Sequence, residues 1–523
     1  MYVLPEHVSR TLGKDAQRTN ILAAKLVADI VKTTLGPKGM DKMLVDSSGN
    51  VIITNDGVTI LEEMDIDHPA AKMMVEIAKT QEEEVGDGTT TAALLAGKLL
   101  EYAEGLLDQR IHPTAIVKGY RLAAEKSLEI LNGLALPVRD KQILQQIAMT
   151  AMTGKGAEGH KEKLARLIVD AVDQIAPETL HGQALHIQKV KGESILESEL
   201  IQGFVLDKEK AHSAMPSRVV DAKILLLDIP LEIHGPEGDT KISVSTPEQL
   251  ESFLASEERS LKAMTQAIIS SGAKVVFCQK GIDDVAQYYL AKEGILAYRR
   301  VPKSALEKIA RAISSMVFSN LHDLSADKLG YAAVVEEVFH GQEAYVYIRG
   351  CKNPKSVTIL IRGSTAHVLD EIERAMKDGL GDVLAAVQSG KVVAGGGAVE
   401  IALARQLRAY ARTLGGREQL AVDEFARALE SIPLTLAENA GLDPIDVLTE
   451  LKKRHEAGLP YQGLNLFTDK VEDTFAAGII EPLKVKTQAI SSAVEVATMI
   501  LRIDDVLISK GSSGLEPRYE GME

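Results

Sequence analysis

The apolar residues of this chain change their spacing twice, and that change limits the folds it can adopt. Apolar residues recur at helical spacing over 20–34, where Gly36-Pro37 ends the pattern, and a second helical run covers 89–107. The middle of the chain instead contains β-rich runs separated by helical segments, at 225–229, 274–279, 295–301 and 356–361. Helical patterns return after residue 397. The sequence therefore predicts a multidomain α+β protein in which an alternating α/β domain lies between two helix-rich ends.

Two segments add detail to this outline. The runs 42–46 and 51–55 are strand-like, and Ser-Ser-Gly-Asn at 47–50 between them predicts a hairpin turn. Thr-Pro-Glu-Gln at 246–249 is a capping box with proline at the first helical position, so a long helix is expected to follow. The polar segment before it, 234–241, is expected to be exposed. Periodicity alone favours a surface loop and a packed helix, and the alternative is a projecting element that meets a partner.

The most specific chemical signal is Gly-Asp-Gly-Thr-Thr-Thr at residues 86–91. Glycines on both sides of Asp87 let the backbone approach an anion, and the helix expected from Thr89 offers unpaired N–H groups and a partial positive charge. A carboxylate at this place can hold Mg²⁺, which takes phosphate oxygens as further ligands. Gly-Asp-Gly is also ordinary turn chemistry and threonine an ordinary helix cap, so the segment alone favours a structural interpretation.

Further segments are candidates for the same chemistry, and each also has an ordinary structural explanation. Residues 35–40, LGPKGM, form a glycine-rich turn without Walker A spacing. Asp56, at the end of a strand, could orient an attacking water. Lys155 lies between glycines ahead of a helix, where it could reach a terminal phosphate. Asp378 is in a helical run where a charged residue is normally solvated, and Gly395-Gly396-Gly397 is a strand-to-helix turn of the kind that approaches phosphates.

The charge balance and the cysteines exclude several classes of protein. The 523 residues, enough for about three or four domains, carry a net charge of −15, which argues against a general nucleic-acid binder. Cys278 and Cys351 are too few for a disulfide framework, and both are expected in a core within a reducing compartment. The N-terminus does not resemble a signal peptide, and no run of about 18 uncharged apolar residues occurs, so we expect a soluble cytoplasmic protein that contacts no membrane.

Several long segments of the sequence occur in the same order as the motifs of a known family. They include TTLGPKGMDKMLVDSSGNVIITNDGVTIL, TQEEEVGDGTTT, TGKGAE, VVFCQKGIDDVAQYYLAKEGILAYRRV, GGGAVE and IIEPLKVKTQAISSAVEVATMILRIDD. In these segments, which extend over nearly the whole chain, the sequence resembles the group II chaperonins, the thermosome and its relatives. The chain departs from the family pattern at Ala394, where proline is frequent, at Glu83-Glu84, and in its last residues, YEGME. The bacterial relatives sometimes set apart as a third group share the same motifs and are an alternative.

The resemblance implies a chaperonin fold with a mainly helical equatorial domain, a small intermediate domain and an α/β apical domain. A helical protrusion of the apical domain at about 231–262 would form a built-in lid, which reverses the simpler interpretation of a plain surface helix. In chain order the expected segments are 1–138 (equatorial), 139–206 (intermediate), 207–361 (apical), 362–394 (intermediate) and 395–523 (equatorial).

The resemblance also implies an ATPase site whose cofactors are ATP and Mg²⁺. Asp87 would hold Mg²⁺, and Asp56 and Asp378 would position and activate the hydrolytic water. Lys155 would sense the terminal phosphate. Because Asp378 and Lys155 would belong to the moving intermediate domain, its movement would gate hydrolysis. The nucleotide would be lined by Thr34, Leu35, Gly36, Pro37, Gly88, Thr89, Thr90, Thr91, Lys155, Gly396, Asn465 and Glu481, the last two near the ribose or adenine.

The function implied is that of an ATP-dependent chaperonin that encapsulates non-native polypeptides and promotes their folding. Its partners would be these clients and further copies of the chain, in a homo-oligomeric double ring of about eight subunits per ring, with no separate co-chaperonin. The alternatives are a chaperonin-like scaffold that binds clients without ATP turnover, and an ATP-dependent small-molecule kinase. The carboxylates Asp56, Asp87 and Asp378 argue against the scaffold, and the sequence offers no evident acceptor pocket for a kinase.

Overall fold

The computed structural model of the chain describes residues 8–45, 49, 51–156, 158–175, 185–192, 194–233, 246–351 and 357–509. Most of the predicted turn at 47–50 and the middle of the predicted lid segment, 234–245, lie outside the described residues. The chain divides into two compact units: unit 1 contains residues 1–158 and 377–523, and unit 2 contains residues 159–376. The five-segment division expected from the family resemblance is finer than this one and stays a prediction.

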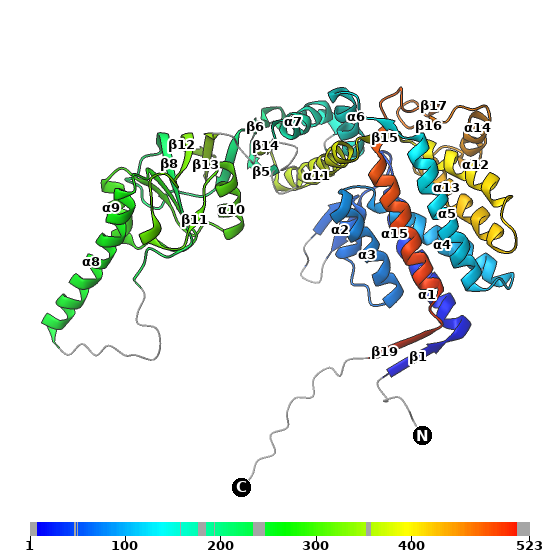
Figure 1. Cartoon of the computed structure of the whole chain (residues 1–523), viewed down its shortest axis with the longest axis horizontal. Coiled ribbons are helices and arrows are strands. Elements are labelled where there is room, and N and C mark those ends of the chain that lie inside the picture. Colours follow the sequence, from blue (N-terminus) through cyan, green and yellow to red (C-terminus); the bar gives the residue numbers. More distant parts are fainter. Residues whose placement is uncertain are drawn as a thin grey trace, which may run out of the picture. The chain divides into compact units, whose positions relative to one another are not determined.

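Unit 1 is built from both ends of the chain, and these ends are mainly helical, as their helical periodicity predicted (Figure 1). Its helices are α1 (Gly13–Lys32), α2 (Gly57–Glu62), α3 (Pro69–Val85), α4 (Thr89–Asp108), α5 (Pro113–Leu134), α6 (Lys141–Met152), the second part of α11 (Ala366–Ser389), α12 (Ala398–Ala411), α13 (Glu418–Asn439), α14 (Pro444–Glu456) and α15 (Leu483–Leu501). Its strands are β1 (Val8–Leu12), β2 (Lys42–Val45), β3 (Val51–Thr54), β4 (Leu136–Pro137), β15 (Lys391–Ala394), β16 (Gln462–Asn465), β17 (Lys470–Asp473), β18 (Ile480–Pro482) and β19 (Asp505–Ser509).

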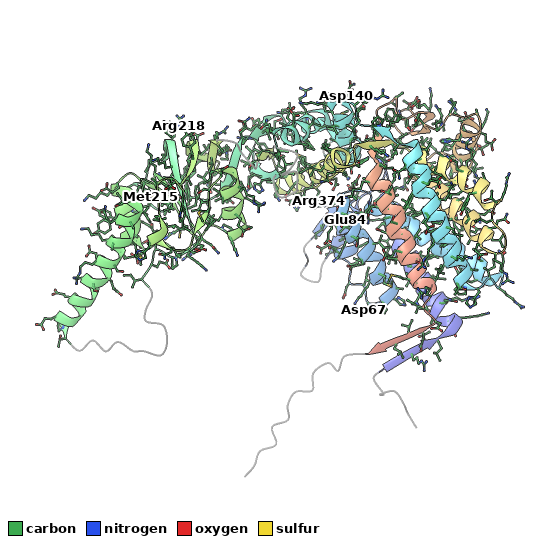
Figure 2. All side chains as sticks on the ribbon, viewed as in Figure 1. Asp67, Glu84, Asp140, Met215, Arg218 and Arg374 are labelled. Carbon is green, nitrogen blue, oxygen red and sulfur yellow. The ribbon has the colours of Figure 1, made fainter. Side chains whose placement is uncertain are left out.

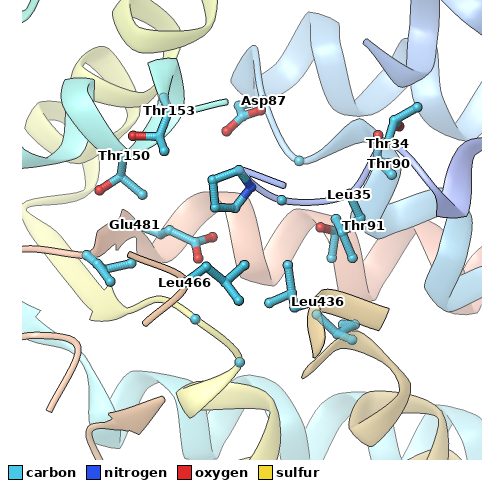
Figure 3. Close-up of a pocket in the computed structure, with 18 of the residues that line it drawn as sticks. Thr34, Leu35, Asp87, Thr90, Thr91, Thr150, Thr153, Leu436, Leu466 and Glu481 are labelled. Carbon is cyan, nitrogen blue, oxygen red and sulfur yellow. The ribbon is translucent and has the colours of Figure 1, made fainter. Parts of the chain in front are cut away.

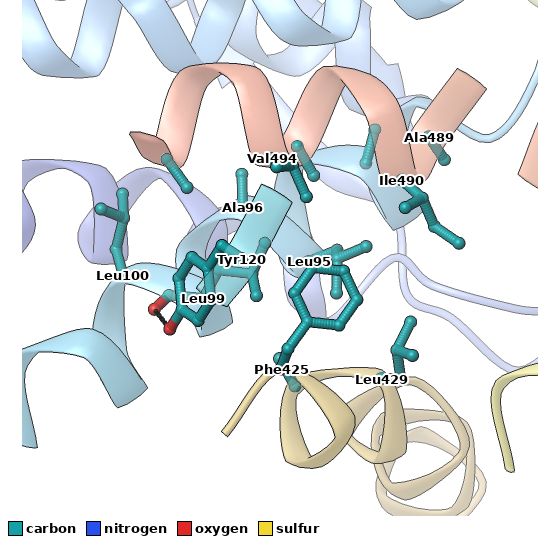
Figure 4. Close-up of a cluster of buried hydrophobic side chains, with 14 of the residues drawn as sticks. Leu95, Ala96, Leu99, Leu100, Tyr120, Phe425, Leu429, Ala489, Ile490 and Val494 are labelled. Carbon is teal, nitrogen blue, oxygen red and sulfur yellow. Dashed lines mark hydrogen bonds between the residues drawn. The ribbon is translucent and has the colours of Figure 1, made fainter. Parts of the chain in front are cut away.

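The core of unit 1 lies where α4 meets α5, α13 and α15 (Figure 4). Leu95, Leu99 and Leu100 of α4 are fully buried, because α4 is apolar on nearly all sides. Tyr120 of α5 meets Phe425 of α13 edge-on with ring centroids 5.8 Å apart. Its hydroxyl donates to the carbonyl oxygen of Leu99 at 2.7 Å. This packing fixes α4 in the centre of the unit, and with α4 the position of its first turn.

Small antiparallel sheets lie at the edges of the helical core of unit 1. β2 pairs with β3, so that Lys42 lies opposite Thr54, which confirms the predicted hairpin strands. β1 pairs with β19, with Val8 opposite Ser509, so the two ends of the described chain meet. Among the described residues each of these sheets has two strands, and its outer edges have no further strand paired to them. A three-stranded sheet, β18-β15-β4, and the pair β16-β17 lie nearer the cavity described below.

Unit 2 contains the alternating α/β part of the chain. Its sheet of seven strands has the order β10-β9-β8-β12-β13-β7, with β11 paired to β8, and a second sheet has the order β5-β14-β6. The strands are β5 (Leu185–Lys191), β6 (Glu199–Ile201), β7 (Gly203–Asp207), β8 (Arg218–Leu227), β9 (Val275–Cys278), β10 (Leu296–Tyr298), β11 (Val317–Phe318), β12 (Gly330–His340), β13 (Glu343–Cys351) and β14 (Val357–Gly363). The helices are α7 (Lys161–Gln174), α8 (Pro247–Ser270), α9 (Asp284–Lys292), α10 (Lys303–Ala312) and the first part of α11.

The core of unit 2 lies on the seven-stranded sheet. β8, β9 and β10 pair in parallel, and the second part of β8 from Ile224 to Leu227 is fully buried with β9 and β10, as expected for strands covered by helices. Met215, labelled in Figure 2 beside the start of β8 at Arg218, is buried with its sulfur 3.3 Å from the backbone nitrogen of Ala297. Cys278 and Cys351 are free and buried, as predicted.

The sequence-based prediction of the elements needs two corrections. The helix predicted over 20–34 begins earlier, at Gly13, because its first turns are polar and show no apolar period. The four predicted β-rich runs are strands, but the long hairpin of β12 and β13, which occupies the centre of the large sheet, was not among them. α8 starts at Pro247 as the capping box predicted. No helix in the described part of the chain is long and apolar enough to cross a membrane.

Candidate functional site

A cavity of about 210 Å³ opens in unit 1 where the ends of several helices and strands meet (Figure 3). Its wall comes from the segment after α1, the turns before α2, α4 and α12, the end of α6, parts of α11, α13 and α15, and the strands β16 and β18 with the residues next to them. All but two of the predicted site residues line this cavity: Thr34, Leu35, Gly36, Pro37, Asp56, Asp87, Gly88, Thr89, Thr90, Thr91, Lys155, Gly396 and Glu481.

The two remaining predicted residues lie beside the cavity. Asp378 accepts a hydrogen bond at 2.5 Å from Nζ of Lys155, which itself lines the cavity. Asn465 is buried at the end of β16, and its Nδ2 donates to Oε1 of Glu472 at 2.5 Å, while the residues on either side of it line the cavity. In this structure Asn465 therefore holds the β16–β17 hairpin, and its contact with a nucleotide stays a prediction.

The turn between α3 and α4 has a backbone that only glycine adopts without strain. Gly86 and Gly88 have φ values of 90° and 80°. The buried Gln81 donates to the carbonyl oxygen of Asp87 at 2.9 Å and holds the turn in place. Gly88 is the N-cap of α4 and offers no side-chain cap, so the first N–H groups of this helix of 20 residues are available where Thr89 lines the cavity. Such groups bind a phosphate well.

A second helix N-terminus reaches the same cavity. β15 leads into Gly396 and Gly397, which have φ values of 65° and 79°, and Gly397 is the N-cap of α12 without a side-chain cap. The carbonyl oxygen of Gly396 accepts from the backbone nitrogen of Leu464 at 2.8 Å, which ties the glycine turn to β16. Two positive helix ends therefore face one cavity, an arrangement that suits a ligand with several phosphates.

The segment from Asn55 to Asp56 brings a carboxylate to the cavity. Nδ2 of Asn55 donates to the carbonyl oxygen of Gly154 at 2.9 Å, which joins this segment to the loop that carries Lys155. Asp56 is the N-cap of α2, because its Oδ2 accepts from the backbone nitrogen of Thr59 at 2.8 Å and from its hydroxyl at 2.7 Å. The cap fixes the Asp56 carboxylate in one orientation at the cavity wall.

Lys155 is surrounded by acidic groups. Its Nζ lies 2.5 Å from Oδ2 of Asp378 and 3.6 Å from Oδ1 of Asp87. Burial opposes the charge of Lys155, but Asp378 and Asp87 outweigh burial and raise its pKa. Burial raises the pKa of Asp378 to about 7, although the attraction of Lys155 works against this. A carboxylate with this pKa can take a proton from a water molecule near neutral pH.

A second lysine connects the cavity with the interior of unit 1. Nζ of Lys486 lies 2.7 Å from Oε2 of Glu481 and 2.9 Å from Oε1 of Glu400. Burial opposes the charge of Lys486, but Glu400 and Glu481 raise its pKa. Burial raises the pKa of Glu481 against the attraction of Lys486. Lys486 is therefore held as a cation between two acids, and Glu481 presents its carboxylate to the cavity in a fixed place.

The far side of the cavity is apolar. Figure 3 shows Leu436 and Leu466 across the cavity from Asp87 and Thr153. The apolar lining consists of Leu35, Ile432, Leu436, Leu464, Leu466, Phe467 and Ile479. A flat ring such as a nucleobase fits an apolar wall, while its charged part reaches the helix ends opposite.

Several lining residues were missing from the sequence-based prediction. Thr150 and Thr153 come from the end of α6, and Lys486 from the first turn of α15. Asp382 follows Asp378 by one helical turn on α11, and this spacing of four residues is the one signal that could have revealed it. The apolar lining residues could not be recognised in the sequence, because buried leucines occur throughout the chain.

The residues present fit a nucleotide with a divalent cation. The two helix N-termini and Lys155 can bind the phosphates, and Asp87 can bind the cation through a hard oxygen ligand. Within the described ranges, no group of three or more His, Cys, Asp or Glu side chains could hold a metal ion alone. A cation at Asp87 therefore needs phosphate oxygens and water to complete its shell.

Comparison with known proteins gives one consistent result. The model of the TCP-1/cpn60 chaperonin family matches residues 27–511. A thermosome subunit beta from Archaeoglobus fulgidus is 59% identical over 517 residues, covering 97% of this chain and 95% of the relative. A thermosome subunit beta from Methanothermobacter thermautotrophicus is 55% identical, covering 100% and 96%. A thermosome subunit from Methanopyrus kandleri is 55% identical, covering 97% and 94%.

Proposed function

The chain belongs to the TCP-1/cpn60 chaperonin family and is an ATP-dependent group II chaperonin with ATPase activity, and we propose that the cavity of unit 1 is where it binds and hydrolyses ATP. One observation carries the assignment: two glycine-capped helix N-termini and the Lys155–Asp378–Asp87 group meet at one cavity with an apolar far wall. This combination offers one binding region for the phosphates and their cation and another for the base of ATP.

Each part of the site has a distinct role in the proposal. The N–H groups at the starts of α4 and α12 bind phosphate oxygens, and Asp87 would hold Mg²⁺, which would supply positive charge to the phosphates. Glu481 lies near the ribose or adenine, and the apolar wall receives the base. Phosphoryl transfer requires mainly positioning and charge stabilisation, and these residues supply both.

Asp56 and Asp378 position and activate the attacking water. In this structure the Asp378 carboxylate is paired with the ammonium group of Lys155. When Lys155 turns to a terminal phosphate, Asp378 loses its partner and its carboxylate becomes free to accept a proton from water. We place Lys155 and Asp378 in a moving intermediate domain, so its movement would couple nucleotide binding to hydrolysis.

The wider function is the encapsulation of non-native polypeptides. Chaperonins of this family act as oligomeric rings on such clients, and we propose a homo-oligomeric double ring of about eight subunits per ring in the cytoplasm. The buried free cysteines fit that compartment. A built-in lid at 231–262 would replace a separate co-chaperonin. In support, α8 packs on the core of unit 2 from Leu261 onward, while its described side chains from Ala255 to Ser260 are mostly exposed.

One experiment tests both the site and the wider function. The wild-type protein is expected to hydrolyse ATP and to refold an aggregation-prone client. Asp378→Ala is expected to bind ATP but to hydrolyse it about 10²-fold or more slowly, and to lose refolding. Asp370→Ala, on the same helix but 43% exposed, serves as the control. A wild type without ATP turnover would instead support the non-hydrolysing scaffold, and full activity in Asp378→Ala would remove Asp378 from the mechanism.

A further inference from the structure

Asp382 on α11 is a buried acid at the wall of the cavity, and one oxygen of its carboxylate has no hydrogen-bond partner in the described part of the chain. It lines the cavity, yet its residue surface is only 1% exposed. Its Oδ1 has no hydrogen-bond partner among the described residues. A buried carboxylate oxygen without a partner costs free energy, because it has lost its water and gained nothing in return. Such a group in a ligand cavity indicates that its partner arrives with the ligand.

The backbone brings Asp382 to the proposed magnesium ligand through two touching glycines. A Cβ atom added to Gly86 would lie 3.1 Å from Cα of Gly381, and one added to Gly381 would lie 2.7 Å from the carbonyl oxygen of Val85. Helix α11 and the turn before α4 therefore pack backbone against backbone, without room for a side chain at either glycine. The residues that follow these glycines are Asp87 and Asp382, and both line the cavity.

Among the described residues no ion pair to Asp382 is found, because both lysines of the cavity pair with other acids. The charged groups in the lining are the four acids Asp56, Asp87, Asp382 and Glu481 and the two lysines Lys155 and Lys486. Lys155 is bound by Asp378 and Asp87, and Lys486 by Glu400 and Glu481. Burial, and after it Asp87 and Glu481, raise the pKa of Asp382 well above its usual value, although the attraction of Lys155 works against this.

We propose that Asp382 binds a second divalent cation in the nucleotide-bound site, beside the Mg²⁺ assigned to Asp87. ATP brings about four negative charges into a cavity that is already acidic, and one divalent cation offsets about half of them. A second cation would satisfy Oδ1 of Asp382 and would supply further positive charge to the phosphates. Because no three acids in the described residues can hold a metal alone, this second cation would bind only together with the nucleotide. The inference rests on the proposed function of the cavity.

Counting bound Mn²⁺ tests this inference directly. The assembled protein would be loaded with MnCl₂ and a non-hydrolysable ATP analogue, and freed of unbound ions by rapid gel filtration. Manganese and nucleotide would then be measured per subunit. Wild type is expected to retain about two Mn²⁺ per nucleotide, and Asp382→Asn, which keeps the shape of the side chain, about one. Asp108→Asn, at an exposed acid on α4, is the matched control and is expected to retain about two.

The outcomes separate this inference from the function on which it rests. One Mn²⁺ per nucleotide in wild type, or two in Asp382→Asn, would overturn the second cation and leave the nucleotide site intact. Retention of neither nucleotide nor Mn²⁺ by wild type would overturn both proposals. Folding of the variant is checked without nucleotide, where Asp382→Asn is expected to melt at the same or a higher temperature, because it removes a buried unpaired acid. A lower melting temperature would mean that Asp382 has a structural partner, contrary to the inference.

Discussion

Asp56 serves both the fold and the proposed chemistry with one carboxylate. Both bonds from Thr59 end on Oδ2, so the cap of α2 uses one oxygen of the group. Asp56 also lines the cavity, where the hydrolytic water is proposed to bind. Loss of the cap and loss of the acid have different consequences, and a suitable pair of substitutions separates them.

We therefore predict that Asp56→Ser and Asp56→Ala differ in stability but not in activity. Serine can cap α2 as aspartate does, so Asp56→Ser is expected to unfold at nearly the wild-type denaturant concentration, whereas Asp56→Ala is expected to lose about 1 kcal/mol. Both should lose ATP turnover by about 10²-fold, because both lack the carboxylate. Steady-state ATPase assays and chemical denaturation provide the measurements. Wild-type turnover in Asp56→Ser would show that Asp56 is a cap only.

At the scale of elements, a single histidine joins α14 to the strand that forms one wall of the cavity. His455, near the end of α14, is 1% exposed, and its Nε2 lies 2.7 Å from the carbonyl oxygen of Gln462 in β16. Because a carbonyl only accepts, Nε2 must donate. Nδ1 is then the unprotonated nitrogen, and it has no partner among the described residues. Burial lowers the pKa of His455, with Arg405 as a further cause.

This lowered pKa predicts acid sensitivity at the α14–β16 junction. The unfolded chain takes up a proton on His455 at a higher pH than the folded one does, so folding is favoured above the usual value of 6.5 and loses stability as the pH falls below it. The slope is at most about 1.4 kcal/mol per pH unit. His455→Gln keeps a donor for the carbonyl oxygen of Gln462. It is expected to reduce the loss of unfolding free energy between pH 7 and 5, by an amount per pH unit on the order of that slope. Denaturation midpoints at fixed protein concentration measure it.

The control for this prediction is His367→Gln, because His367 is exposed on α11. This variant should keep the wild-type dependence on pH. An unchanged dependence in His455→Gln would mean that other groups cause the acid sensitivity of the protein.

The elements that the sequence revealed are those with local signals. The first turn of α4 and the glycine turn before α12 were predicted because their glycines, hydroxyls and helical periods are neighbours in the chain. The hairpin of β12 and β13 was missed although it carries a local signal: β12 alternates between buried and half-buried positions over much of its length, and β13 is buried from Ala344 to Ile348. Asp382 and Lys486 were missed because their role at the site depends on partners that the fold brings from distant segments of the chain.

For the whole molecule, the main consequence of the topology is that unit 1 needs both ends of the chain. Nε2 of Gln17 in α1 donates to the carbonyl oxygen of Leu501 in α15 at 3.2 Å, across 484 positions of sequence. β1 likewise pairs with β19. Residues 159–376 form their own unit, and their core can form before the C-terminal segment is available. The proposed ATP site contains residues from both ends, so it is complete only after the last helix has packed.

The β2–β3 hairpin indicates how subunits could join into the proposed ring. Met43, Val45 and Ile53 on this hairpin are 66%, 62% and 51% exposed. A two-stranded sheet with apolar side chains and open edges is marginally stable alone and tends to pair with another chain. In a homo-oligomer, that other chain is a second copy of the same subunit. The hairpin is therefore our candidate for the contact between neighbouring subunits.

Met43→Lys is predicted to weaken this assembly without unfolding the subunit. On a free surface the change would alter stability by about 0.5 kcal/mol or less, but at a subunit contact it would bury an unpaired charge. Sedimentation velocity should then show smaller species at protein concentrations where wild type forms rings, with unchanged circular dichroism. Ile445→Lys, which replaces an apolar residue 73% exposed at the start of α14, is the matched control and should assemble normally. If Met43→Lys also assembles normally, the ring contact lies elsewhere on unit 1 or unit 2, because an interface cannot accept an unpaired lysine at its centre without a loss of affinity.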